Sequence, residues 1–142
     1  IIALIIAILI TLLADEIILF LFGDPFIQSA NVLIIHIWAS LFIFMRAVFS
    51  KWVLIENMLV FSVVTEGLGT ISNILLNLWF IPNFGLTGAA FASLISYAIA
   101  SYFSLLLHPR SRIVFIMMSK AMFSPFRYLI PKKFFQIEFK KV

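Results

Sequence analysis

Long apolar stretches, separated by short polar or turn-prone groups, run from the start of the sequence to about residue 108. This pattern predicts four helical segments, at about residues 1–22, 27–54, 58–81 and 86–107. No residue between Glu66 and Arg110 is charged, and one straight helix over that tract would be about 64 Å long, roughly twice the ~30 Å hydrocarbon core of a bilayer. We therefore expect two crossings there, with the chain turning at "IPNFGLTG", residues 81–88.

The composition of the chain also indicates a membrane protein. The chain of 142 residues is 64% hydrophobic and 11% charged, and its mean hydropathy is +1.19. An ordinary soluble domain is about 45–50% apolar and about 25% charged. We expect an all-α integral membrane protein of about four transmembrane helices. Because the sequence starts at Ile1 inside an apolar run, without a basic region ahead of it, we interpret it as a C-terminal portion and not as a signal peptide with a mature chain.

Several classes of chemistry find no support in the sequence. Cysteine is absent, and His36 and His108 are far apart with no ligand spacing around either, so neither a metal site nor a cofactor is expected. No phosphate-binding glycine loop and no hydrolase motif is present, so we do not expect an enzyme. The net charge of +4 needs no nucleic acid to explain it in a membrane protein.

The basic residues predict an orientation. Lys51 lies near the loop after the second segment and eight of the ten Lys and Arg residues follow His108, whereas the loops after the first and third segments have none. Basic loops stay in the cytoplasm. The turn at residues 81–88 is therefore expected outside and the C-terminus inside the cytoplasm.

The last part of the sequence, residues 109–142, mixes bulky apolar residues with Lys and Arg and contains Pro125 and Pro131. Basic segments rich in aromatic residues partition to anionic membrane surfaces. We expect a cytoplasmic, interfacial tail in contact with membrane lipids; a specific site for a lipid headgroup or a protein partner is the alternative.

The third segment carries polar residues along one face. On a helical wheel with 100° between successive residues, six polar or small residues fall within an arc of about 100°. These are Ser62, Glu66, Gly69, Thr70, Asn73 and Asn77. Leucine, isoleucine and valine occupy the opposite side. Polar side chains are costly against lipid, so this face is expected to look into a helix bundle or a water-accessible cavity.

Glu66 is the sharpest functional candidate. A carboxylate inside a span costs on the order of 3 kcal/mol, so it is normally paired, protonated or solvated. Arg46 and Glu66 each lie ten residues from Glu56 in the intervening turn, so antiparallel helices would place them at similar depth and could pair them. One hypothesis is that Arg46 only snorkels to the interface and Glu66 is a structural polar contact. The other is that Glu66 exchanges protons or cations during transport, or that Arg46 or Lys51 meets an anionic substrate.

Three other polar residues are expected to serve packing. Asn73 and Asn77, four residues apart, are predicted to link helices by hydrogen bonds more readily than to touch a substrate, although both remain transport candidates. His36 is interpreted as a packing residue and not as a proton relay.

The fourth segment resumes with small residues on one side. Small side chains let helix backbones approach closely where the hydrophobic effect cannot drive association. The residues expected to form this packing seam are Gly88, Ala89, Ala92, Ser93, Ser96 and Ala100.

The stretch "NILLNLWFIPNFGLTGAAFASLISYAIASY" resembles a pattern near the C-terminus of the polysaccharide-biosynthesis flippases, the O-antigen transporter branch of the superfamily that includes multidrug and toxic compound extrusion transporters. "IILFLFGDPFIQSANVLIIHIWASLF" is similar to an upstream segment of the same family. "KWVLIENM" stands where members commonly have a loop with small residues, and Glu56 and Met58 depart from that pattern. The resemblance covers about residues 1–108. The residues in step with the main pattern are Asn73, Asn77, Ile81, Pro82, Gly85, Gly88, Ala89, Ala90, Ala92 and Ser93.

This resemblance implies that residues 1–108 are the last four helices of a bundle of two pseudo-symmetric halves, completed by N-terminal helices of the same transporter. It implies alternating access, with an undecaprenyl-pyrophosphate-linked oligosaccharide moved from the cytoplasmic to the periplasmic leaflet of the bacterial inner membrane before O-antigen, lipopolysaccharide or capsule assembly. Two transport alternatives stay open: a drug or cation exporter, and a peptidoglycan-precursor flippase. A third alternative is a membrane subunit that does not transport and packs against a partner in polysaccharide synthesis.

Overall fold

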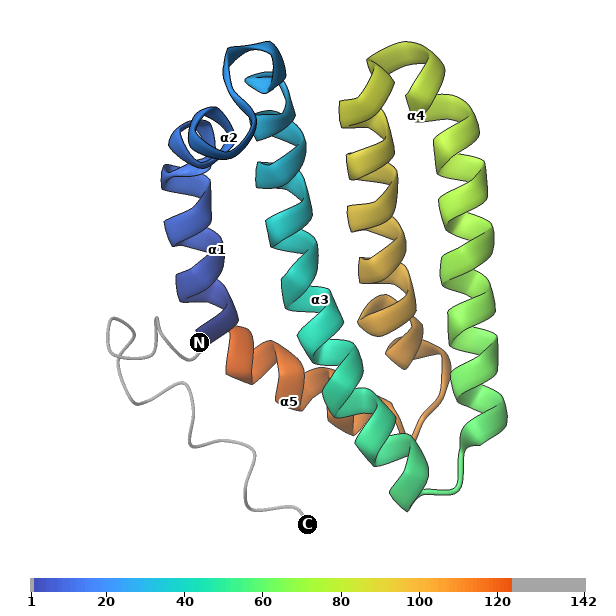
Figure 1. Cartoon of the computed structure of the whole chain (residues 1–142). Coiled ribbons are helices and arrows are strands. Elements are labelled where there is room, and N and C mark those ends of the chain that lie inside the picture. The colour runs from blue at the N-terminus through green and yellow to red at the C-terminus, as the bar shows by residue number, and fades with distance from the viewer. Residues whose placement is uncertain (1, 124–142) are drawn as a thin grey trace.

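The computed structural model describes residues 2–123, and this part of the chain contains helices and no strand (Figure 1). The all-helical prediction is confirmed for these residues. The elements in chain order are α1 (Ile2–Leu12), α2 (Ala14–Phe22), η1 (Asp24–Phe26), α3 (Ser29–Ile55), α4 (Leu59–Ser101), η2 (Phe103–Leu107) and α5 (Arg112–Phe123).

Two helical stretches of the described residues are long and apolar enough to cross a membrane. They are Ser29–Ile55 and Leu59–Leu107, and the bent pair of α1 and α2 makes a third if it counts as one span. A membrane protein is therefore consistent with the fold, and the turn regions after α2 and within α4 lie at one end of the bundle while the turn between α3 and α4 lies at the other (Figure 1). This order of ends agrees with the predicted alternation of crossings.

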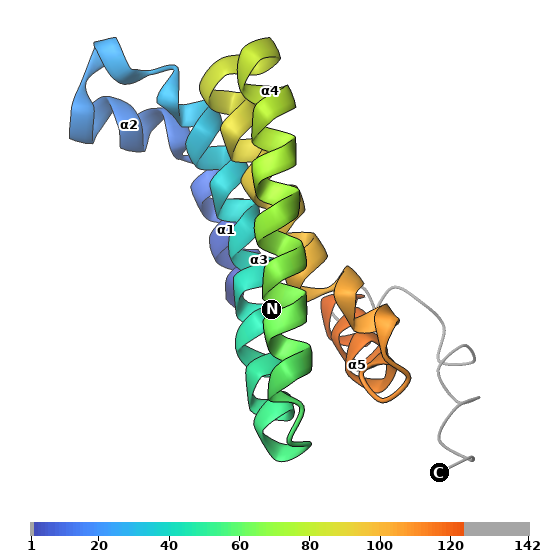
Figure 2. The same cartoon turned by 90° about the vertical axis from the view of Figure 1, so that its right-hand side faces the viewer.

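The first predicted segment, residues 1–22, is not one straight helix. It breaks at Leu13, where α1 ends, and α2 leaves at an angle of 66° to α1 and projects away from the bundle (Figure 2). Asp15 and Glu16 occupy the first turn of α2. Carboxylates are favourable at a helix N-terminus, so a new helix beginning just before them is stabilised there.

α4 folds back on itself at the predicted turn. Gly85 has φ 58° and ψ −136°, a conformation in which a side chain would be strained, and Pro82 supplies no backbone N–H to the helix just before it. The two parts of α4, here called the first arm (residues 59–84) and the second arm (residues 86–101), lie side by side (Figure 1). The turn predicted at "IPNFGLTG" is confirmed.

Small residues let the two arms approach closely. A Cβ atom added to Gly69 on the first arm would lie 2.6 Å from Cβ of Ala100 on the second arm, and one added to Gly88 would collide with the carbonyl of Phe80. Ala92 and Ser96 of the second arm are buried, and Ala89 and Ser93 are half-buried. Of the predicted packing residues, Gly88 and Ala100 lie at these close approaches between the two arms.

α5 packs across the C-terminal half of α3. The turn between α3 and α4 extends past it (Figures 1 and 2), and Val114 and Met118 on α5 join a buried cluster with Phe49, Val53 and Leu105. The hydroxyl groups of Tyr102 and Ser119 are 2.6 Å apart and tie α5 to the end of α4. The predicted tail at residues 109–142 thus begins with a helix packed on the bundle, and its residues 124–142 lie outside the described part of the chain.

Replacing the two neighbouring glycines of the first arm should have opposite effects. Gly69→Ala should lower the thermal unfolding midpoint of the detergent-solubilised protein, because overpacking typically costs 1–3 kcal/mol. Gly67→Ala is the matched control, since a Cβ added there meets nothing within 4 Å. Alanine is favoured over glycine in a helix by about 1 kcal/mol, so the Gly67 variant should melt at the same temperature or higher. Equal midpoints for the two variants would contradict a close contact at Gly69.

Candidate functional site

An arginine connects α3 with both arms of α4. The Arg46 Nη2 atom lies 2.7 Å from Oε1 of Glu66, and the Arg46 side chain is 15% exposed. The ion pair expected between these two residues is present. Arg46 is bonded between the helices, and its depth relative to a membrane, on which the snorkelling hypothesis depends, stays a prediction.

Both terminal nitrogens of the guanidinium have several partners. Nη1 donates to the hydroxyl of Thr65 at 2.8 Å and to the carbonyl of Ala100 at 3.2 Å. Nη2 donates to the hydroxyl and the carbonyl of Ser62 at 2.9 and 3.3 Å. The ring of Phe49 lies 4.9 Å from Cζ of Arg46. A guanidinium has five N–H donors in a planar fork, so one residue can bond three helical segments at once.

Glu66 differs from its partner in exposure. Its side chain is 60% exposed, and it lies on the wall of a groove of about 360 Å³ between the two arms. The groove, here called the polar groove, is lined by Glu66, Gly69, Thr70, Asn73, Ile74, Ser93, Ser96, Tyr97 and Ala100. Glu66 therefore both pairs with Arg46 and forms part of the wall of the polar groove.

The predicted polar face of the third segment divides into two parts. Four of its six residues line the polar groove, from Glu66 to Asn73. Ser62 bonds Arg46 instead. Asn77 lies one turn beyond Asn73 and donates to its Oδ1 atom at 2.9 Å, within the first arm. Among the described residues the hydrogen bond between these asparagines stays within one helix, and their linking of helices stays a prediction.

Several hydroxyls of the groove and its neighbourhood are used within their own helix. Thr70 donates to the carbonyl of Glu66 at 3.0 Å, and Ser96 donates to the carbonyl of Ala92 at 2.6 Å. Such bonds satisfy a hydroxyl where little water is present. Asn73, Ser93 and Tyr97 leave polar atoms on the groove wall that could meet a solute.

Sequence reasoning missed two participants and gave two others only a packing role. Thr65 was outside the predicted polar face although it binds Arg46, and Tyr97 was not singled out although it lines the groove. Ser93 and Ser96 were assigned to packing alone, yet both also line the groove. The signal was the spacing of Ser93, Ser96, Tyr97 and Ala100, which places them on one face of a helix.

His36 stands apart from this site. It lies on α3 and is exposed, so the expectation that it packs against the described helices is wrong. Among residues 2–123 no group of three His, Asp or Glu side chains could hold a metal ion.

Comparison of the chain with protein-family models, with curated proteins and with solved structures finds no match. Function is therefore inferred from the groove, its charged pair and the resemblance of the sequence pattern.

Removing Arg46 should cost much more stability than removing Glu66. Arg46→Gln leaves the Thr65 hydroxyl and the Ala100 carbonyl without their charged donor, and breaking such a buried set typically costs about 3–5 kcal/mol. Glu66→Gln removes the charge of an exposed partner, which is worth about 0–1 kcal/mol. Reversible unfolding in mixed detergent micelles measures both differences.

Arg110→Gln is the matched control, because Arg110 is exposed and its side chain is far from this junction along the chain. It should leave the unfolding free energy within about 0.5 kcal/mol of the original protein. If Arg46→Gln were equally mild, Arg46 would not connect the three segments in solution.

Proposed function

We propose that this chain is part of a flippase for lipid-linked oligosaccharides, in which residues 2–107 supply four crossings of a larger helix bundle. The observation that carries the proposal is the polar groove between two apolar, closely packed arms, with an exposed carboxylate on its wall. A polar groove facing lipid would be costly in a membrane, so it is expected to face further helices or a solute. The resemblance of "IPNFGLTGAA" to the polysaccharide-biosynthesis flippases adds the substrate class.

In this proposal the substrate is an undecaprenyl-pyrophosphate-linked oligosaccharide, and the membrane is the bacterial inner membrane with the C-terminus in the cytoplasm. The hydroxyls, amides and carboxylate of the groove suit sugar hydroxyls, which need many hydrogen-bonding partners. The pyrophosphate would be engaged by cationic residues of the further helices, because Arg46 is already bonded to Glu66, Thr65, Ser62 and Ala100.

Glu66 is proposed as a coupling residue. A proton or a cation can replace Arg46 as the partner of Glu66 without unfolding the arms, because Arg46 keeps its bonds to Thr65, Ser62 and Ala100. A change in this one pair would alter the charge on the groove wall. Alternating access requires such a differential interaction between two states.

A cation exporter of the same superfamily is the second candidate, and a specific observation favours it. Glu66 is the one carboxylate that lines the polar groove, and it is 60% exposed. A carboxylate in a groove attracts cationic solutes. A peptidoglycan-precursor flippase would use the same groove for a different sugar. In a subunit that does not transport, the groove would bind no transported solute.

Transport by the protein in proteoliposomes tests these candidates. The expected result is translocation of a fluorescent undecaprenyl-pyrophosphate oligosaccharide, slowed by Glu66→Gln at least about tenfold, because a charge-assisted contact is worth about 1.5–3 kcal/mol. Glu56→Gln, which removes an exposed carboxylate in the turn between α3 and α4, should leave the rate unchanged.

The other outcomes separate the alternatives. Movement of a lipophilic cation in place of the oligosaccharide would favour the exporter, and selective movement of the peptidoglycan precursor would favour that flippase. Movement of none of them would favour the subunit that does not transport. Unchanged flux and unchanged pH dependence in Glu66→Gln would remove the coupling role and leave the flippase proposal standing.

A further inference from the structure

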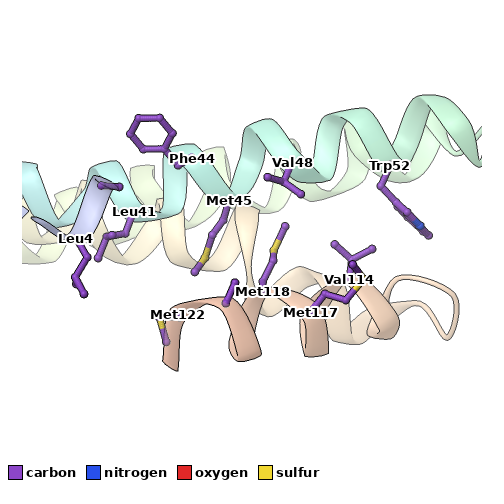
Figure 3. A pocket seen from close by; sticks show the side chains of 12 residues that line it. Leu4, Leu41, Phe44, Met45, Val48, Trp52, Val114, Met117, Met118 and Met122 are labelled. Carbon is purple, nitrogen blue, oxygen red and sulfur yellow. The ribbon is translucent and has the colours of Figure 1, made fainter. Parts of the chain in front are cut away.

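A second groove lies at the end of the bundle where α5 crosses. It is separate from the polar groove and is formed by α3 and α5, with the start of α1 at one side (Figure 3). We call it the apolar groove. Its lining consists of Ala3, Leu4, Leu41, Phe44, Met45, Val48, Trp52, Val114, Met117, Met118, Ala121 and Met122.

The lining of the apolar groove suits a flexible hydrocarbon. Every side chain in it is apolar or aromatic, and the volume of about 430 Å³ lies within the range of ligand pockets, about 300–1,000 Å³. Met45, Met117 and Met118 converge on it from α3 and α5 (Figure 3). Methionine side chains adapt to irregular apolar shapes. An extended peptide would leave its backbone N–H and C=O groups unpaired here, whereas an acyl chain has none.

The charges of the described residues are separated between the two ends of the bundle. The end with the apolar groove has four basic residues and one acid: Lys51, Arg110, Arg112, Lys120 and Glu56. The opposite end has three acids and no basic residue: Asp15, Glu16 and Asp24. Helices α2 and α5 mark these ends in Figure 1. The net charge at the end with the apolar groove therefore favours an anion. The net charge at the other end disfavours one.

Lys51 is a basic residue of this end that is adjacent in sequence to the lining of the apolar groove. It lies on α3 beside Trp52 and one turn after Val48, both of which line the apolar groove, and it is exposed. Trp52 itself lies at the outer end of the lining (Figure 3), as expected for a side chain that prefers the membrane interface.

We propose that the apolar groove binds an anionic phospholipid, with one acyl chain along the methionines and the phosphate at Lys51. Two independent features argue for this ligand: a groove lined without polar side chains, and an excess of basic residues in the half of the bundle where the groove lies, with Lys51 next to the lining residue Trp52. A neutral phospholipid would gain the first contact and not the second. The proposal concerns a structural or regulatory lipid and does not depend on which solute the polar groove carries.

Tryptophan quenching by brominated lipids tests the proposal at single residues. The protein with Trp38→Phe and Trp79→Phe keeps only Trp52, and the protein with Trp38→Phe and Trp52→Phe keeps only Trp79 at the opposite end. Each is placed in phosphatidylcholine vesicles with increasing fractions of brominated phosphatidylglycerol or brominated phosphatidylcholine. Trp52 should show about fivefold preference for phosphatidylglycerol, as one nearby Lys or Arg contributes about 1 kcal/mol toward anionic lipid. Trp79 should show no preference.

Two substitutions separate the groove from the charge. In the protein that keeps Trp52, Lys51→Gln should remove most of the preference for phosphatidylglycerol, and Ala121→Phe should reduce quenching by filling the groove. Ile116→Phe is the control for Ala121→Phe, because Ile116 is exposed on α5 outside the lining. Unfolding midpoints are measured for every variant, so that a loss of quenching is read only from folded protein.

Three results would overturn the proposal. Equal preference at Trp52 and Trp79 would mean that the groove does not select anionic lipid. Preference retained in full by Ala121→Phe would mean that surface charge alone attracts the lipid. Absence of quenching at Trp52 by either lipid would mean that protein, from a second copy or from another part of the chain, fills the groove.

Discussion

A guanidinium placed among apolar helices sets the arrangement of this molecule. Removing such a charge from water costs several kcal/mol unless hydrogen bonds and an opposite charge replace the solvent. Arg46 meets this requirement with groups from both arms of α4: Ser62, Thr65 and Glu66 on the first and the Ala100 carbonyl on the second. Because Arg46 itself belongs to α3, these bonds fix the position of the α4 hairpin relative to α3. The close approach of Gly69 and Ala100 occurs at the same level, so the arginine and the packing seam support each other.

The two members of the ion pair beside the polar groove differ in exposure. Arg46 is almost fully enclosed, whereas Glu66 is mostly exposed, so the negative member of the pair is the one that a solute or an ion can reach. The arms can keep their packing when the charge on Glu66 is altered, since the other bonds of Arg46 do not involve it. A bundle with this property can combine a stable frame with a site whose charge responds to its surroundings.

Much of the fold could be predicted from the sequence, because the deciding signals are local. The apolar run at residues 27–54 and the turn at "IPNFGLTG" follow from hydropathy and from Pro82 and Gly85, and both are present. The break at Leu13 could not be predicted in this way, because no proline or glycine marks it, and Asp15 and Glu16 suit the interfacial end of a continuous helix as well as the first turn of a new one. The Arg46 and Glu66 pair was predictable from their equal distance to the turn.

Other parts of the site depend on contacts that a sequence does not display. Thr65 lies outside the polar arc, and it becomes a partner of Arg46 only because α3 crosses the first arm at that residue. Asn77 could reach either a second helix or Asn73, and the choice depends on how far away the neighbouring helix lies.

The two close contacts between the arms also decide how a molecule can reach the polar groove. The arms touch at Gly69 and Ala100 and again at Phe80 and Gly88, next to the turn that joins them. A hairpin held at both levels has no open axis along which a solute could thread. If the polar groove takes a solute, as proposed above, these contacts favour lateral entry through the open side of the groove. For an amphiphile this route has a simple advantage, because the head can enter between the arms while the hydrocarbon portion stays among the lipid chains.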